Sequence, residues 1–247
     1  MDFIKLPLTE KELFSYHYSI TYFMIGIWIV FAAIAYFSKS KKIIINVTYF
    51  LIILSFFQEL LDYINRIFIN DLYIATISKD LPLQLCHFAY WFTVICLIMS
   101  VSNKSYKYKN FFFNCAYIFG FGAFQGIITV DITGLYTFGD ILALHLQHSI
   151  IVLNLIWLIF CYGFQLDKKG IFHAFLTINI LVLFIGFINY FLKSNYMFLC
   201  QPPDINNIFI VGEWPFYIIA IEVVIIFAGY LLYLPFKLVN EIKEKAS

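Results

Sequence analysis

Charged residues are scarce in this chain: Lys and Arg total 16 and Asp and Glu total 15, together 13% of 247 residues. Hydrophobic residues make up 62%. A soluble domain carries about twice that fraction of charge, so the composition excludes one and is typical of a polytopic membrane protein. The net charge of +1 offers no basic surface, and no nucleic-acid partner is expected.

Targeting and linker segments are also lacking. No basic stretch precedes a short apolar core at the N-terminus, so a cleaved signal peptide is not expected. No connection is long enough for a second domain, and residues 1–247 are predicted to form a single transmembrane domain. Thr9 and Glu12 have the spacing of a capping box, which predicts a short surface helix at about residues 9–16.

The sequence consists mainly of long hydrophobic runs. Each is near the length of about 20 residues that a helix needs to cross a bilayer. The predicted spans are approximately 18–37, 43–65, 82–101, 110–130, 141–164, 171–192 and 214–236. Continuous runs favour helices over the short alternating strands of a barrel. The predicted fold class is therefore all-α, a polytopic bundle of seven transmembrane helices.

Basic residues predict the orientation of this bundle. Eleven of the sixteen fall on one side, in the first, third and fifth connections and the C-terminal tail. These are Lys39, Lys41, Lys42, Lys104, Lys107, Lys109, Lys168, Lys169, Lys237, Lys243 and Lys245. By the positive-inside rule, the C-terminus is expected in the cytoplasm and the N-terminus outside. We expect a multi-pass protein of the plasma (cell) membrane.

Threading the spans in order gathers polar and reactive side chains in the outer leaflet or at its edge. They are Glu59, Asp62, Arg66, Gln84, Cys86, His87, Gln125, His145, Gln147, His148, Asn189 and Glu213. Polar groups are costly in hydrocarbon, so a group of them at one depth indicates a functional site.

Cys86 has three interpretations. It is a nucleophile, a partner of Cys200 in a disulfide on the oxidising side, or an inert thiol. A nucleophilic thiol needs a base, and His145 and His148 share one helix face at i and i+3. His87 follows Cys86 directly, and helix neighbours diverge by about 100°, so a histidine from another helix is the better base.

The second span carries a polar seam, with Gln58, Asp62 and Arg66 at i, i+4 and i+8 and Glu59 beside them. In one interpretation a carboxylate and Arg66 neutralise each other inside the bundle. In the other, Arg66 binds a lipid phosphate while Glu59 or Asp62 orients a histidine.

Several strings resemble the motifs of the YwaF-type bacterial integral membrane family. Residues 81–86, LPLQLC, resemble the family's LPLHLC motif, and residues 14–17, FSYH, its opening element. Residues 195–200, NYMFLC, resemble NYMYLC, residues 212–215, GEWP, resemble GPWP, and residues 233–235, YLP, resemble its closing LLYLPF. The resemblance therefore covers nearly the whole chain.

The YwaF-type family is similar to a transmembrane acyltransferase of animals that makes polyunsaturated ether phospholipids. That resemblance implies chemistry by a Cys-His pair, with Cys86 as nucleophile, His148 as base and His145 as the second choice. The sequence departs from the family pattern at Gln84, where the motif has His, and at Glu213, where it has Pro.

The leading hypothesis is a membrane-embedded lipid acyltransferase or lipid hydrolase that forms a thioester in the outer half of the membrane. Its partners are membrane phospholipids or lysophospholipids, and no cofactor is expected. Gln84 and Gln147 are candidate oxyanion donors. The remaining candidate substrate-binding residues are Arg66, Glu59, Asp62, His87, His17 and Glu213.

Two other functions stay open. In the first, His87, His145 and His148, with His17, Glu59 or Asp62 as further candidates, hold zinc in a lipid hydrolase. In the second, the polar group is the pocket of a lipid or small-molecule binding or transport subunit. The sequence contains no P-loop, so under the transport hypothesis an ATPase partner supplies the energy.

Overall fold

The computed structural model describes residues 6–102, 108–203 and 210–246. These residues form seven α-helices and no β-strand beyond an isolated bridge between Pro7 and Thr137. The helices are α1 (Glu10–Phe37), α2 (Lys41–Ile64), α3 (Leu85–Val101), α4 (Lys109–Ile128), α5 (Phe138–Tyr162), α6 (Lys168–Leu192) and α7 (Phe216–Ala246). A π-helical turn, η2 (Asn65–Ile69), extends α2, and a 3-10 turn, η3 (Tyr196–Phe198), follows α6. The all-α prediction is confirmed.

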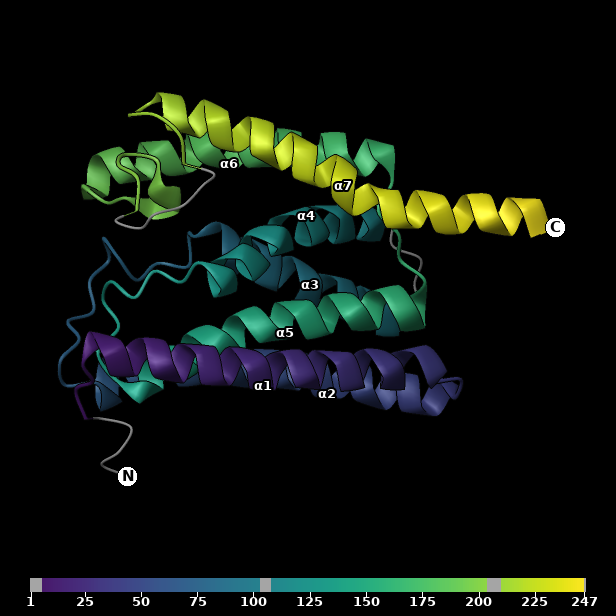
Figure 1. The fold of residues 1–247 in the computed structure, drawn as a ribbon, viewed down its shortest axis with the longest axis horizontal. Coiled ribbons are helices and arrows are strands. Elements are labelled where there is room, and N and C mark those ends of the chain that lie inside the picture. Colours follow the sequence, from purple (N-terminus) through teal and green to yellow (C-terminus); the bar gives the residue numbers. More distant parts are fainter. Residues whose placement is uncertain (1–5, 103–107, 204–209, 247) are drawn as a thin grey trace.

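Helix α5 is the centre of the bundle. It contacts α1, α2, α3 and α4, whereas α6 and α7 pack against α4 and against each other (Figure 1). The start of α1 and the end of α7 lie at opposite ends of the bundle (Figure 1). The loops that enter α3 and α5 and the start of the one that leaves α6 lie at the same end of the bundle as the start of α1.

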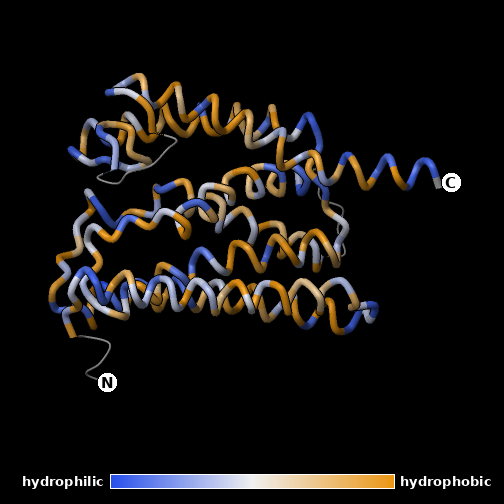
Figure 2. Tube along the Cα trace, viewed as in Figure 1, coloured by the Kyte–Doolittle hydropathy of each residue, from blue (hydrophilic) through white to orange (hydrophobic). Residues whose placement is uncertain are grey.

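Six of the helices in the described residues are long and apolar enough to cross a membrane: α1, α2 with η2, α4, α5, α6 and α7. Figure 2 shows hydrophobic residues along these helices and hydrophilic residues mainly near their ends. Helix α3 is apolar but has only 17 residues. At 1.5 Å per residue it is roughly 26 Å long, slightly less than the hydrocarbon thickness of a bilayer.

Three predicted boundaries were wrong. The surface helix at 9–16 and the first span form one continuous helix, α1, because no breaker separates them. Helix α3 begins at Leu85 and not at residue 82, since residues 81–84 form bends and contact the loop after α6. Helix α7 continues past Pro235 to residue 246, although a proline removes one backbone hydrogen bond.

Local sequence explains where two helices begin. The capping box predicted at Thr9 and Glu12 is present, with reciprocal bonds between the two residues. Thr137 and Asp140 form a second capping box at the start of α5. Each box satisfies backbone N–H groups that have no partner within the helix.

A buried polar contact joins the central helices. Asn154 of α5 donates to Thr93 Oγ1 of α3 at 3.0 Å and to Ser55 Oγ of α2 at 3.4 Å. Trp157 Nε1 donates to Thr48 Oγ1 of α2 at 2.9 Å. Hydrogen bonds of this kind hold helices together in lipid, where apolar burial gives little driving force. They fix α5 against α2 and α3, the helices that carry the predicted site.

The orientation of the bundle stays a prediction. The start of α1 and the end of α7 lie at opposite ends of the bundle, as an odd number of spans requires (Figure 1). Lys104 and Lys107, which contribute to the charge argument, lie outside the described residues.

Candidate functional site

The predicted nucleophile lies in the first turn of α3. Cys86 and His87 are half-buried, and Cys86 Sγ is 3.8 Å from His87 Nδ1. The sequence argument that His87 diverges from its neighbour's thiol was therefore wrong. Backbone directions do diverge by about 100°, but the imidazole is long enough to turn back towards Sγ. An imidazole thus contacts the thiol directly.

The alternative of a Cys86–Cys200 disulfide is not realised. Both residues have free thiols, with Cys86 half-buried and Cys200 exposed. Cys200 belongs to the loop after α6, where its backbone N–H donates to Asn195 Oδ1 at 2.9 Å.

His148 of α5 has a defined tautomer. Its Nδ1 is 2.8 Å from the carbonyl oxygen of Leu144, one turn earlier. A carbonyl only accepts hydrogen bonds, so Nδ1 carries the proton and the neutral ring has its lone pair on Nε2. His148 also interacts electrostatically with His87, which places the two imidazoles in the same region. The side chain as a whole is only 7% exposed, and Nε2 is its proton acceptor.

His145, the second choice as base, has a different partner. Its Nε2 is 3.0 Å from His17 Nδ1 of α1, and both histidines are buried. The opposite nitrogen, His145 Nδ1, is buried without a hydrogen-bond partner in the described part of the chain. This pair joins α1 to α5 and directs the Nε2 of His145 towards His17.

The predicted zinc ligands do not assemble. Within residues 6–102, 108–203 and 210–246, no three His, Cys, Asp or Glu side chains come together as ligands. His145 is directed at His17, and the Nδ1 of His148 is occupied by its own helix. The set of His87, His145 and His148 therefore does not form such a group in the described residues.

Unsatisfied polar atoms lie on α2 and α5. In the described residues, Glu59 Oε2, Gln58 Oε1 and Gln147 Nε2 are buried and have no hydrogen-bond partner. The Gln147 amide lies near the Glu59 carboxylate without completing a bond to Oε2. Buried polar groups in proteins are nearly always satisfied, so such a group indicates a place for water or a ligand.

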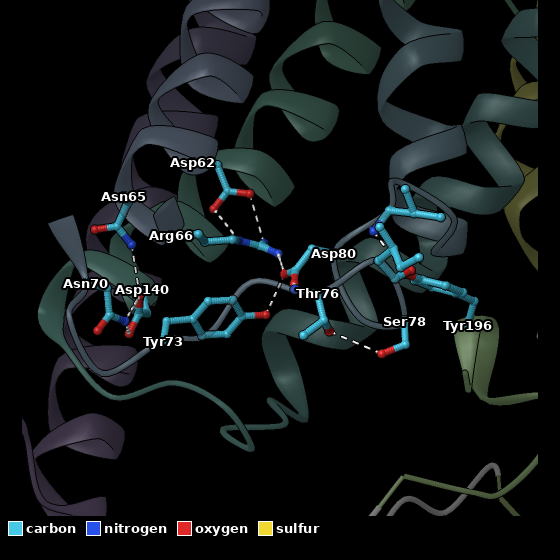
Figure 3. A network of polar contacts seen from close by, with 12 residues as sticks. Asp62, Asn65, Arg66, Asn70, Tyr73, Thr76, Ser78, Asp80, Asp140 and Tyr196 are labelled. Atoms are coloured by element: carbon cyan, nitrogen blue, oxygen red, sulfur yellow. Dashed lines mark hydrogen bonds and ion pairs between the residues drawn. The ribbon is translucent and has the colours of Figure 1, made fainter. Parts of the chain in front are cut away.

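Arg66 lies between two carboxylates (Figure 3). Its guanidinium is 2.8 Å from Asp62 and 3.2 Å from Asp80. Tyr73 donates a short hydrogen bond to the same Asp80 oxygen. Burial, followed by this hydrogen bond, raises the pKa of Tyr73, so the phenol stays a donor at neutral pH. The contacts favour mutual neutralisation over the binding of a lipid phosphate by Arg66.

A second acid at this end of the bundle is held by neutral donors (Figure 3). Asp140 accepts from the amides of Asn65 and Asn70 at 2.8–2.9 Å. The backbone N–H groups of Tyr136 and Thr137 donate to it at 2.9 Å. Asp140 thus links η2 and the following loop to the start of α5.

The loop after α6 forms hydrogen bonds with the segment that precedes α3. The Tyr196 hydroxyl accepts from Leu81 N at 2.9 Å and donates to Ile77 O at 2.7 Å. Met197 N donates to Gln84 Oε1 at 2.9 Å, while Asn189 holds the backbone of Tyr196 from α6. These contacts position Gln84 and, two residues later, Cys86. Glu213, in contrast, is exposed.

The sequence analysis missed Asp80, Tyr73, Asn65, Asn70 and Asp140. The spacing of Thr137 and Asp140 as a second capping box was a signal for the last of these. The others become partners only through the path of the loop between η2 and α3, for which the sequence contains no periodic pattern.

We expect Tyr196→Phe to lower the free energy of unfolding by about 1–3 kcal/mol, because Leu81 N–H and Ile77 C=O lose a shared partner. Burial raises the pKa of Tyr196, so the hydroxyl remains protonated and able to donate at neutral pH. Thermal unfolding in detergent measures the change. The matched control is Tyr190→Phe, an exposed ring on α6. Equal stability of the two variants would show that the Tyr196 hydroxyl does not brace the loop.

Apolar helices that enclose buried histidines and amides, with a half-buried thiol beside them, define a multi-pass helical membrane protein with an internal polar site. Comparison with known families matches residues 11–233 to the TMEM164 family. The chain belongs to the TMEM164 family. No curated protein and no solved structure matches it.

Proposed function

We propose that this protein is a membrane-embedded lipid acyltransferase or lipid hydrolase that forms a thioester on Cys86. The observation that carries the proposal is the half-buried thiol of Cys86 in contact with the imidazole of His87. His87 in turn interacts with His148, whose Nε2 holds the lone pair of its ring. The resemblance to the YwaF-type family and its animal acyltransferase relative supports the same chemistry.

Backbone N–H groups at the start of α3 favour negative charge on the sulfur of Cys86 and offset part of the cost of burying it. The helix begins at Leu85, and its N-cap residue, Gln84, makes no side-chain cap. The first N–H groups of a helix lack intrahelical partners and carry the positive end of the helix dipole. A thiolate in the first turn, and an oxyanion formed next to it, are stabilised by this environment.

Two side-chain amides have the donors that an oxyanion needs. Gln84 Oε1 is occupied by Met197 N, which orients the amide and leaves Nε2 with no acceptor among the described residues. Gln147 Nε2 is buried and likewise unpartnered in the described chain. Preorganised donors of this kind contribute several kcal/mol to acyl transfer.

In this mechanism the ester carbonyl of a phospholipid approaches Cys86. His148 Nε2 takes the thiol proton, sulfur attacks the carbonyl carbon, and the proton then passes to the leaving lysolipid oxygen. A lysophospholipid or water resolves the thioester. We assign His148 as the base because its lone pair is fixed by Leu144. His87, in contact with Sγ, orients the thiol.

A lipid-like electrophile tests this assignment on purified protein in nanodiscs. We expect selective labelling of Cys86, and we expect His148→Ala to slow it about a hundredfold or more, as loss of a general base does. Mass spectrometry locates the label. His87→Asn is expected to have the smaller effect. A larger loss in His87→Asn than in His148→Ala would transfer the role of base to His87, and an unreactive Cys86 would remove the mechanism.

We further propose a plasma-membrane location, a single domain over residues 1–247, and a cytoplasmic C-terminus. The excess of basic residues on one side supports the orientation. The outer leaflet then supplies phospholipid and lysophospholipid to the end of the bundle that holds Cys86.

A further inference from the structure

Gly126 of α4 directly faces the proposed base. A Cβ at this position would lie 3.5 Å from His148 Nε2 and 3.9 Å from Cδ2. The bare backbone therefore leaves space beside the nitrogen that holds the lone pair. At Gly122, one turn earlier on the same face, a Cβ would be 3.8 Å from Leu85 Cδ2 of α3. This face of α4 thus borders both the start of α3, next to Cys86, and the Nε2 of His148.

The nitrogen that faces Gly126 has no partner. His148 is 93% buried, since its exposed fraction is 7%. Nδ1 is committed to Leu144, and no hydrogen bond to Nε2 is found within the described residues. With Nδ1 protonated, Nε2 holds the lone pair of the ring and can accept from an O–H or N–H group of a ligand.

We propose that Gly126 is a specificity-determining residue, whose missing side chain makes room for the hydroxyl of a lysolipid beside His148 Nε2. This inference rests on the proposed function and specifies where the second substrate, the lysolipid, binds. An oxygen that donates to Nε2 lies about 2.8–3.0 Å from it. A methyl group 3.5 Å from the same nitrogen would compete with that oxygen and with the carbon that carries it.

The same position serves acyl transfer to a lysolipid and the reverse reaction, acylation of Cys86 by a phospholipid. In acyl transfer, the lysolipid O–H gives its proton to Nε2 while its oxygen forms a C–O bond with the thioester carbonyl. The C–S bond breaks, and the proton returns from Nε2 to Cys86 Sγ. Acylation by a phospholipid is the reverse of these steps, so the leaving lysolipid oxygen occupies the same place. Water is small enough to react without that space.

Gly126→Ala and Gly122→Ala form a matched pair. Both replace glycine by alanine inside α4, where alanine is the better helix former by about 1 kcal/mol. Both new methyl groups would make ordinary contacts, at 3.5 Å and 3.8 Å. The two variants should therefore fold equally well, and only the first alters the space at His148.

The experiment uses the full chain in nanodiscs with p-nitrophenyl laurate as acyl donor and lysophosphatidylcholine as acceptor. The p-nitrophenolate leaving group needs no proton, so its release reports acylation of Cys86 without the proposed lysolipid position. Release of lauroyl phosphatidylcholine and of laurate then reports how the thioester divides between the lysolipid and water.

We expect Gly126→Ala to acylate Cys86 at nearly the wild-type rate and to lower the ratio of transfer to hydrolysis by about tenfold or more, since small displacements in a reacting geometry have effects of this size. Gly122→Ala should keep the wild-type ratio. If Gly126→Ala keeps the wild-type ratio of transfer to hydrolysis while Cys86 is still acylated, the inference is overturned and the proposed function stands. If wild-type protein forms no acyl-Cys86, the proposed function fails and the inference fails with it.

Discussion

Replacement of Cys86 by alanine is expected to abolish thioester formation and acyl transfer. Loss of a covalent nucleophile typically lowers turnover by a factor on the order of 10⁴ or more. The thiol is half-buried, and its removal leaves the His148–Leu144 and Gln84–Met197 contacts intact. Lipid binding and thermal stability should therefore change little. Intact-mass spectrometry detects the acyl adduct, and hydroxylamine sensitivity identifies it as a thioester.

Cys200→Ala is the matched control for this prediction. Cys200 is an exposed, free thiol in the loop after α6, and we expect its replacement to leave both the adduct and turnover unchanged. A Cys86→Ala protein that retains full transfer would contradict a thioester mechanism. Loss of activity in both variants would instead indicate a functional link between the two thiols.

Replacement of Arg66 by methionine is expected to lower the free energy of unfolding by about 3 kcal/mol, the cost of breaking a buried ion pair from one side. Methionine keeps much of the apolar stem, but it leaves Asp62 and Asp80 facing each other without a cation (Figure 3). Both carboxylates are poorly exposed, at 9% and 11% of their side chains. Their charge is therefore weakly screened. Thermal unfolding in detergent measures the loss.

Asp62→Asn removes the charge of one of the two carboxylates that Arg66 contacts. Asparagine preserves shape, and Arg66 keeps Asp80 as a partner at 3.2 Å. The double variant Asp62→Asn/Arg66→Met should be more stable than Arg66→Met alone, because one uncompensated carboxylate is gone. If Arg66→Met is as stable as wild type, the guanidinium does not neutralise these acids. That result would favour the interpretation in which Arg66 binds a lipid phosphate.

Hydrophobic patterning predicted most of the helices. Long apolar runs placed α2, α4, α5 and α6 within a few residues, since continuous burial in lipid requires continuous apolar sequence. The same patterning misplaced the start of α3. Residues 81–84 are apolar enough to extend a helix, but their backbone and side chains bond to the loop after α6 instead.

The sequence also contained part of the candidate site. His145, Gln147 and His148 share neighbouring faces of α5, and their burial follows from the central place of that helix. The sequence could not assign their partners. His17 lies 128 residues from His145 along the chain, yet their ring nitrogens are 3.0 Å apart.

The sequence alone determined that this is an all-helical membrane protein, because the cost of unpaired backbone in lipid leaves no other structure for long apolar runs. It also determined which residues can carry chemistry, since thiol, imidazole and carboxylate groups are properties of single residues. Only the tertiary structure decided which of these groups meet. It turned His87 towards Cys86, fixed the lone pair of His148 on Nε2, paired Arg66 with Asp80 and set Gly126 opposite the imidazole. Such contacts depend on rotamers, on loop paths and on how neighbouring helices pack, and none of these has a period that can be read along the chain.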